Sequence, residues 1–485
     1  MSSQPTPRDG NGPDQEKGPT LSLAAQEQPN HAQRPECFTS TFQECLFVLT
    51  ATMAIGQQSF YQGCIVGVTA SIGADLNMNP AEITWINAGA SLSSGAFLLT
   101  FGKLADMFGR KALFIIGMAG FSLSLLIAGF ATNAIYMDVF SGVLGLFAAA
   151  VVPPAVGALG AVYEKPSKRK KSRLCMFQTP LSVSAIRQVD LLGTALVIAG
   201  FAFFSSSLTL AGDAPQGWKT GYVLALLIVG VVLLAGFLYW QSIAEYALMP
   251  LWVWKDRNFS LLMANFCLGF MGFSAVTFFL SLYLQEIEHL SALDITVRLL
   301  PMVVSGVLVN VICGLILHRV SNTLLVGVGS LAYLASFLIL SFMKEEALYW
   351  VYIFPALVLV VVGADISFNV TNMYVMSSLP PSQQSIAGGI FNTVSKLCNN
   401  LGLGIATSIS SSMASQKAAS TSNIRPYLAV YWFGAACAGL SVLLVPLLTL
   451  GTQGGDVQSE NEPIVVAPDV EATIRQAPAL GSGKS

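Results

Sequence analysis

Two glycines and three charged residues stand close together between two apolar runs near residue 105. They follow the order Gly102-Lys-Leu-Ala-Asp106-Met-Phe-Gly109-Arg110-Lys111. Glycines permit a tight turn between antiparallel helices. Asp106 can form an ion pair with Arg110, or interact with the positive N-terminal end of a neighbouring helix. Such a pair could hold one conformation and release it in another, and the simpler alternative is a tight loop whose charges only anchor the topology.

A second set of polar residues lies deep inside two apolar runs. Asp365 and Lys396 each lie 15 residues from a Pro-Pro pair at 380–381, so two antiparallel helices would carry them at similar depth. Amide residues share their helical faces, namely Asn369 and Asn372 with Asp365, and Asn392 with Lys396. We expect these two faces to line a cavity in which Lys396 balances Asp365 or exchanges a proton with it. A buried structural ion pair is an equal alternative.

The first apolar run carries Gln58, Tyr61 and Gln62 near its middle. Glutamines and a tyrosine suit hydrogen bonding to a polar solute, and we place them with the candidate cavity. Hydrogen bonding between helices without any substrate explains the same residues equally well.

The sequence lacks the residues that metal binding, nucleotide binding, nucleic-acid binding or catalysis would need. The three histidines are scattered, and no CxxC pair occurs among the eight cysteines, so we expect no metal site, disulfide framework or cofactor. No G-x-x-x-x-G-K-[ST] nucleotide motif is present. The net charge of −2 gives no basic stripe for nucleic acid. Neither a catalytic nucleophile nor a pair of acids stands near a membrane face, so we expect no enzyme.

The composition places these residues in a membrane. Apolar residues make up 54% of the 485-residue chain and charged residues 10%, with a mean hydropathy of +0.64. Runs of about 20 apolar residues recur, which is the length that crosses the hydrocarbon core as a helix, and they are too uniformly apolar for barrel strands. We predict an all-α protein with about twelve spans near 45–71, 83–102, 112–131, 136–162, 191–211, 221–240, 260–284, 295–317, 324–342, 348–376, 384–412 and 428–449.

The spans divide into groups separated by polar segments. We expect a disordered tail at 1–41, a four-helix first bundle at 42–162 and a basic loop at 163–190. A helix pair at 191–240, a six-helix second bundle at 241–450 and a disordered tail at 451–485 would follow. Thirteen Lys and Arg residues fall in one set of loops and five in the other, which predicts that both termini are cytosolic.

The Gly102–Lys111 stretch resembles the G-x-L-a-D-r-x-G-r-k signature of the major facilitator superfamily of transporters. It falls in the cytosolic loop between the second and third spans, where that family has it. A degenerate copy, Gly314-Leu-Ile-Leu-His318-Arg319, follows the span at 295–317. A weak repeat in two halves fits the internal symmetry of such transporters. The resemblance implies the two-bundle fold of that family.

Leu379-Pro-Pro-Ser-Gln-Gln-Ser-Ile-Ala-Gly-Gly-Ile-Phe-Asn392 and Gly363-Ala-Asp365 narrow the resemblance. They are similar to fungal drug:proton antiporters of the fourteen-span group, in the branch with aminotriazole-resistance, boron-efflux and low-affinity ammonium transporters. The resemblance covers nearly all of 42–450. It implies proton-coupled export or exchange of a small polar compound or drug by alternating access. We expect a monomer in the plasma membrane, with the vacuolar membrane as the alternative, because no sorting motif decides between them.

The chain departs from that group before the helix pair at 191–240. The group has six helices there, whereas this sequence offers four, and the fifteen residues from Cys175 to Val189 cannot hold two more spans. The G-x-x-x-G-P-x-x-G-G signature of the fifth helix is absent, and Asp138 stands where the group has an arginine. The fifth and sixth helices are therefore predicted to be missing. The chain could be a twelve-span transporter, or a non-transporting sensor or defective truncated isoform.

Overall fold

The computed structural model describes residues 40–163, 190–415 and 424–451, apart from residues 77, 79, 215, 245–247, 318, 345–347, 381 and 382. Within these ranges the chain forms twelve α-helices, three short 3-10 helices and no strand. The α-helices are α1 (Thr41–Asp75), α2 (Pro80–Phe108), α3 (Arg110–Ala128), α4 (Ala134–Tyr163), α6 (Leu191–Asp213), α7 (Gly221–Ile243), α8 (Arg257–Glu286), α9 (Ala292–Ile316), α10 (Asn322–Ser341), α11 (Ile353–Ser377), α12 (Gln384–Ser415) and α13 (Arg425–Leu444). The 3-10 helices are η1 (Gly217–Lys219), η2 (Leu251–Lys255) and η4 (Val445–Leu447). The all-α prediction is confirmed.

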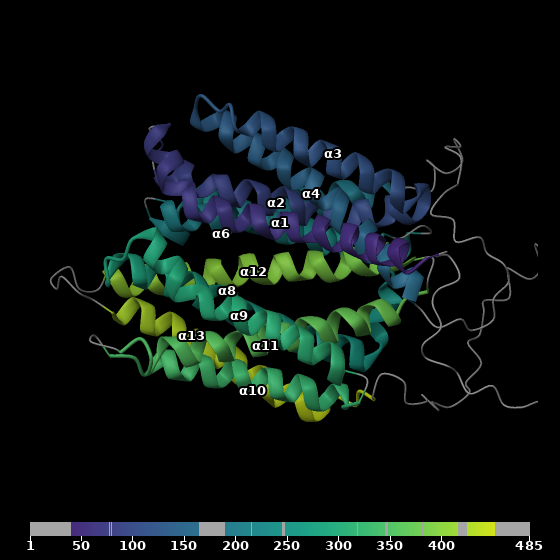
Figure 1. Ribbon diagram of the computed structural model, residues 1–485. Coiled ribbons are helices and arrows are strands. Elements are labelled where there is room, and N and C mark those ends of the chain that lie inside the picture. Colours follow the sequence, from purple (N-terminus) through teal and green to yellow (C-terminus); the bar gives the residue numbers. More distant parts are fainter. Residues whose placement is uncertain are drawn as a thin grey trace, which may run out of the picture.

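The helices run roughly parallel to one another and form two layers (Figure 1). Nine of those in the described ranges are long and apolar enough to cross a membrane. Because every backbone N–H and C=O of a helix is satisfied within the helix, this is the form that an apolar chain takes in hydrocarbon. The described chain ends, at the start of α1 and after η4, lie at the same end of the molecule (Figure 1).

Each layer has its own apolar core. In the first layer, α1 to α4 bury Tyr61, Ile86, Phe121, Met137 and Leu144 against one another. In the second, α8 and α10 to α13 enclose a larger core that includes Val276, Tyr333, Phe337, Leu357 and Val430. Helix α9 packs mainly on α11. The first layer (α1 to α4) and the second layer (α8 to α13) are therefore separate packing units, and we call them the two halves of the molecule.

The halves meet where α12 packs against α2 and α4. A third apolar cluster fills this seam at one end of the molecule. It takes Leu99 from α2, Val197 from α6, Met263 from α8, Val375 from α11 and Phe391 from α12. This end of the seam is thus closed by a shared core.

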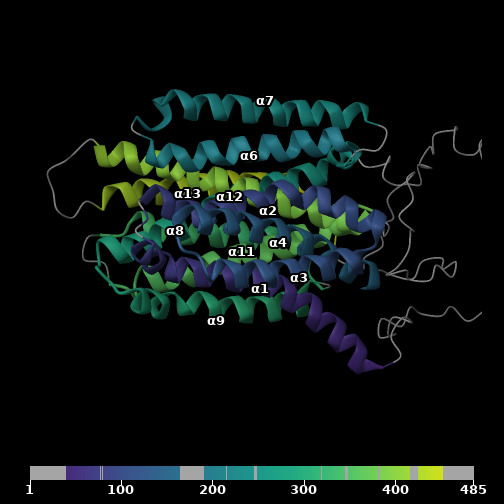
Figure 2. The same cartoon turned by 90° about the horizontal axis from the view of Figure 1, so that it is seen from above.

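The pair α6–α7 covers one edge of the seam, with α6 against α2 and α12 and α7 outside it (Figure 2). Asp190 ties the pair together at the N-cap of α6. Its carboxylate accepts hydrogen bonds from the Gly193 backbone N–H at 2.7 Å, from Trp240 Nε1 at 2.8 Å and from Gln241 Nε2 at 2.7 Å. Trp240 and Gln241 lie in the last turn of α7, so one half-buried carboxylate fixes the start of α6 to the end of α7.

Several expectations fall outside the described residues or need correction. The tail at 1–41, the basic loop at 163–190 and the tail at 451–485 lie outside them except for their end residues, and so does His318 of the second motif copy. The span expected at 83–102 is part of a helix that continues to Phe108. This extension carries Asp106 in the last turn of α2, beyond the apolar run.

Candidate functional site

The loop motif forms a compact polar contact at the turn between α2 and α3. Gly109 has a φ of 104°, a conformation that favours glycine, and it reverses the chain between Phe108 and Arg110. Arg110 begins α3 and points back at Asp106. Its Nε and Nη2 donate to Asp106 Oδ1 at 3.0 and 2.8 Å. The expected ion pair between Asp106 and Arg110 is therefore present.

The same carboxylate reaches across the seam to the N-terminus of α12. The backbone N–H of Ser385 donates to Asp106 Oδ1 at 3.2 Å, and that of Ile386 donates to Oδ2 at 2.9 Å. Arg110 Nε also donates to Ser385 Oγ at 2.9 Å. The first N–H groups of a helix have no partner within the helix and carry its positive end. Asp106 therefore uses both interactions that the sequence offered as alternatives.

Burial strengthens this contact, which we call the latch (Asp106, Arg110, Ser385 and Ile386). The Asp106 side chain is 5% exposed and that of Arg110 is 17% exposed. Hydrogen bonds to an ionised group are roughly twice as strong as neutral ones, and exclusion of water strengthens them further. The latch therefore joins the halves by charge as well as by packing.

Close backbone approach makes the latch possible. The motif suggested that Gly102 is part of the turn, but Gly102 lies within α2. An added Cβ at this position would stand 2.7 Å from the carbonyl oxygen of Ser385. Gly157 of α4 approaches from the other side, and its Cβ would be 2.2 Å from Ser385 Oγ. Lys111 follows Arg110 in the first turn of α3 and is half-buried. Only glycine at positions 102 and 157 therefore allows α12 to pack this closely against α2 and α4.

Asp365 has a different partner from the one expected. It lies at the centre of α11, and its Oδ2 accepts a hydrogen bond from Asn310 Nδ2 of α9 at 2.9 Å. Asn369 Nδ2 donates to Asn310 Oδ1 at 2.9 Å. The three side chains form a polar ladder between α9 and α11. Asn310 was missed from the sequence, although it is an isolated amide within the apolar run 299–313.

Lys396 does not join this ladder, since no ion pair within 4.0 Å links it to Asp365 in the described part of the chain. Lys396 is half-buried on α12, and Asn392 on the same helix donates to its own helix at the Gly388 carbonyl at 2.9 Å. Asn372 is half-buried on α11. The expected pairing is wrong for this conformation because equal depth along two helices does not fix which faces meet.

The polar residues of α1 turn toward the first layer. Gln58 Nε2 lies 3.5 Å from Ser94 Oγ of α2, and the Tyr61 ring packs edge-on against Phe121 of α3, with the ring centroids 5.9 Å apart. The Gln62 side chain lies outside the described residues. The expected single cavity that includes α1 is therefore not assembled in this conformation.

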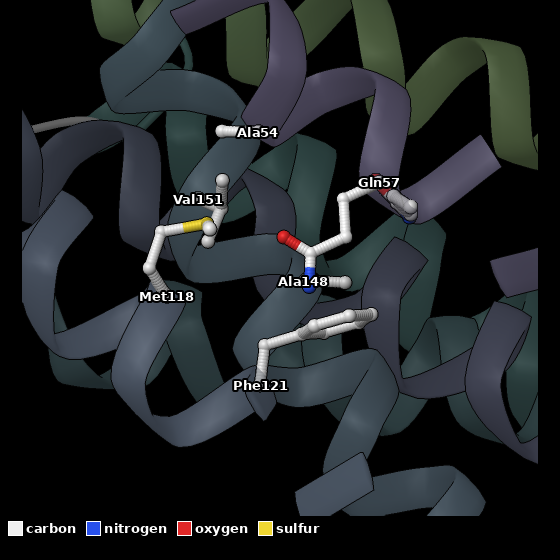
Figure 3. A pocket seen from close by; sticks show the side chains of 7 residues that line it. Ala54, Gln57, Met118, Phe121, Ala148 and Val151 are labelled. Atoms are coloured by element: carbon white, nitrogen blue, oxygen red, sulfur yellow. The ribbon is translucent and has the colours of Figure 1, made fainter. Parts of the chain in front are cut away.

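A small cavity does lie beside these residues, between α1, α3 and α4 (Figure 3). Its volume of about 10 Å³ holds about one water molecule. Gln57 lines it beside Gln58, together with Ala54, Met118, Phe121, Ala148 and Val151. Gln57 was not among the predicted residues, and the cavity is too small for a solute larger than water.

Ser385 was also missed as a functional residue. It lies in the stretch 379–392 that carries the family resemblance. A serine there gives no sign in the sequence of a contact with Asp106 and Arg110, which lie 279 and 275 positions earlier. Among the described residues, no group of three His, Cys, Asp or Glu side chains could hold a metal ion.

Comparison with known proteins gives consistent matches. The family model described as Major Facilitator Superfamily matches residues 46–403. The low affinity ammonium transporter of Saccharomyces cerevisiae is 23% identical over 421 positions, which take in 76% of this chain and 80% of that protein. The aminotriazole resistance protein of the same yeast is 22% identical over 470 positions, with 85% of each chain covered.

An efflux pump and a solved transporter structure are also similar to this chain. Efflux pump terJ of Aspergillus terreus is 21% identical over 486 positions, which take in 89% of this chain and 92% of the pump. Among solved structures, the nucleoside transporter NupG aligns with 82% of this chain and 99% of its own, at 10% identity and a TM-score of 0.47.

Proposed function

This chain belongs to the Major Facilitator Superfamily, and we propose that it couples proton movement to the export or exchange of a small polar compound or drug. Its place in the family makes it a multi-pass membrane protein and a secondary transporter of small molecules. The resemblance to the aminotriazole-resistance and low-affinity ammonium transporters is confirmed by the matches over most of the chain. Export in particular is supported by the likeness to an efflux pump.

The observation that carries the proposal is the latch. Alternating access requires a contact between the halves that exists in one state and is broken in the other. A carboxylate that accepts from Arg110 within its own half and from two backbone N–H groups of the other half is such a contact. With Gly102, Asp106, Gly109, Arg110 and Lys111 on the cytosolic side, the latch closes the cytosolic end of the seam in this conformation.

The orientation in the membrane follows from the charge bias of the loops, which favours both termini in the cytosol. We further propose that the protein acts as a monomer in the plasma membrane, with the vacuolar membrane as the alternative. The α2–α3 turn and both described chain ends then share the cytosolic end (Figure 1).

Asp365 is the residue to which we assign the proton. An ionisable group in the middle of a span is costly unless it has a function or a partner. The ionised carboxylate accepts from Asn310, which is held in turn by Asn369. Protonation would remove the charge and weaken this ladder, and so change how α9 and α11 pack. Lys396, Asn372 and Asn392 stay candidates for substrate contact in another conformation, with Gln58, Tyr61 and Gln62.

The test uses purified protein in vesicles with aminotriazole and methylammonium as probes, chosen from the names of the relatives. An imposed pH gradient should drive probe movement by the unaltered chain. Asp365→Asn should abolish gradient-driven movement while exchange of labelled for unlabelled probe continues. Asp294→Asn, at an exposed acid whose side chain bonds to Ser291, should behave like the unaltered chain. Gradient-driven movement that survives in Asp365→Asn contradicts the assignment.

A second candidate function is a non-transporting sensor or a defective truncated isoform. The observation that favours it is the exposure of α9, of which only 11% is buried over Leu293–Ile316. A correctly localised chain that moves neither probe, with or without a gradient, favours this alternative.

A further inference from the structure

Two cysteines from helices far apart in the sequence meet inside the second half. Cys267 lies on α8 and Cys398 lies on α12, and these two helices pack side by side (Figure 1). A hydrogen bond joins their two thiols, and neither cysteine takes part in a disulfide. Neither residue belongs to the latch or to the Asp365 ladder, so the proposed function does not account for the pair.

The backbones of α8 and α12 come very close beside this pair. Met271 and Gly402 lie four residues, about one helical turn, after Cys267 and Cys398 respectively. An added Cβ on Gly402 would stand 2.5 Å from the Met271 carbonyl oxygen and 2.9 Å from the Met271 Cα. Packed helices ordinarily keep their axes about 8–10 Å apart, whereas a disulfide needs Cα atoms about 4.4–6.8 Å apart. Gly402 thus provides, one turn from the thiols, the close approach of two backbones that a disulfide requires.

Contacts on both sides of the pair hold α8 and α12 in register. Toward the latch end, the ring centroids of Phe266 and Phe391 lie 5.1 Å apart. Away from the latch end, Ser274 Oγ lies 3.4 Å from the Asn399 carbonyl oxygen. The two thiols are therefore held opposite each other by the packing of the helices that carry them.

The surroundings of the pair select the kind of reagent that reaches it. Cys267 is half-buried, whereas Cys398 is 7% exposed. The neighbouring Phe266 and Phe391 belong to the apolar cluster of the seam, and charged groups are costly at this depth in a membrane. A peroxide is small and uncharged, and the oxidation of cysteine by peroxides favours the more exposed thiol. Cys267 is therefore the first thiol to react.

We infer that Cys267 and Cys398 form a peroxide-sensitive dithiol whose oxidation ties α12 to α8. The Cys267 sulfur attacks hydrogen peroxide, the O–O bond breaks, and a sulfenic acid and one water form, the water taking the thiol proton. The Cys398 sulfur then attacks the sulfenic sulfur. The S–O bond breaks and a second water leaves as the S–S bond forms. Two thiols lose two electrons, and one peroxide is reduced to two waters.

The product is a reversible covalent bond within the second half. It would fix α12, whose N-terminus supplies the backbone N–H donors of the latch, to its neighbour α8. A thiol reductant would break it by thiol–disulfide exchange. The chemistry needs only the two cysteines and a peroxide, so it stands apart from proton coupling and from the identity of the transported compound.

Cleavage of the chain between the two cysteines tests the inference. A protease site is inserted between α10 and α11, so that Cys267 and Cys398 fall on different fragments, and all other cysteines are replaced by serine. Membranes are treated with hydrogen peroxide, free thiols are blocked with N-ethylmaleimide, and the cut protein is run on denaturing gels with and without reductant. The matched control retains Cys313 and Cys437 instead, because the cut separates them too and they are buried, at 5% and 6% exposure.

We expect peroxide to keep most of the cut Cys267–Cys398 protein joined on the gel without reductant, and dithiothreitol to separate the fragments. Cys267→Ser, Cys398→Ser and the Cys313–Cys437 control should each give at least ten-fold less joined product. Joined product no greater than that of the control would overturn the inference.

Mass spectrometry of the unaltered chain checks that the inserted site has not created or destroyed the contact. After peroxide treatment and alkylation, the peptides that contain Cys267 and Cys398 should appear as one disulfide-linked pair. The same peptides recovered only as separate alkylated species would overturn the inference for the native protein.

Discussion

Asp106 is held by three elements at once, and its position makes sense only when the halves are together. It lies at the C-terminal end of its own helix, where the helix dipole disfavours an acid. It also lies at the N-terminal end of α12, where the dipole favours one, and both of its oxygens accept hydrogen bonds there. Separation of α2 from α12 would remove both backbone N–H donors and leave Asp106 with the charged groups of its own half, such as Arg110. The residue therefore stabilises one state selectively.

Asp106→Asn should open the latch. The substitution keeps the size of the side chain but removes the charge, and a hydrogen bond to a charged group contributes about 1.5–3 kcal/mol. Since about 1.4 kcal/mol changes an equilibrium tenfold, we expect a tenfold or larger shift toward the cytosol-open state. The measurement is maleimide labelling from the cytosolic side of Val156→Cys, which lies against Gly388 of α12 in the closed latch.

The matched control is Asp294→Asn, which removes an acid at an exposed position outside the latch. Arg110→Ala should increase labelling in the same direction as Asp106→Asn and lower flux while the protein still reaches the membrane. Labelling rates and flux that match the unaltered chain in both latch variants would refute the gating role.

At the scale of elements, the seam depends on how closely α12 can approach α2 and α4. Helices approach most closely where one presents no side chain, and membrane helices use small residues for this purpose. Gly102 and Gly157 serve it on opposite sides of Ser385. Both lie at the latch end of the seam. The close packing of α2, α4 and α12 and the polar latch therefore close the same end of the seam together.

Gly157→Ala should weaken this closure even though it removes no polar group. The added Cβ would lie 2.2 Å from Ser385 Oγ and 2.7 Å from the Ser385 backbone nitrogen, so α12 must move away. Overpacking of this kind costs about 1–3 kcal/mol. We expect faster cytosolic labelling of Val156→Cys and at least a several-fold loss of flux.

Gly236→Ala on α7 is the control for helix propensity, because an added Cβ there meets nothing within 4 Å. It should leave labelling and flux unchanged. A Gly157→Ala protein that labels at the rate of Gly236→Ala would show that α4 does not limit the closure.

At the scale of the whole molecule, the arrangement is two packing units with one seam, one edge of which the α6–α7 pair covers. The even number of helices in the described ranges puts both described chain ends on the latch side. The turn that contains Gln216, between α6 and α7, lies at the opposite end (Figure 2). Orientation in the membrane therefore decides whether the latch closes the cytosolic or the outer entrance.

Epitopes at both chain ends and after Gln216 should report that orientation in intact cells. Because of the excess of Lys and Arg on the latch side, we expect antibodies to reach the Gln216 epitope without permeabilisation and the terminal epitopes only after it. Staining of a terminal epitope on intact cells would reverse the orientation and make the described conformation closed to the outside.

The sequence by itself determined the class, the helical architecture and the motif. Apolar runs of membrane length dictate helices because hydrocarbon leaves the backbone no other partner, and the spacing of Gly102, Asp106, Gly109 and Arg110 depends only on neighbours along the chain. The tertiary structure alone decided which faces meet. Asp106 finds Ser385, and Asp365 finds Asn310 rather than Lys396, because the rotation of each helix about its axis is set by packing against other helices. The depth of a residue in the membrane follows from its position along its helix, whereas its partner on a neighbouring helix follows from how the helices pack.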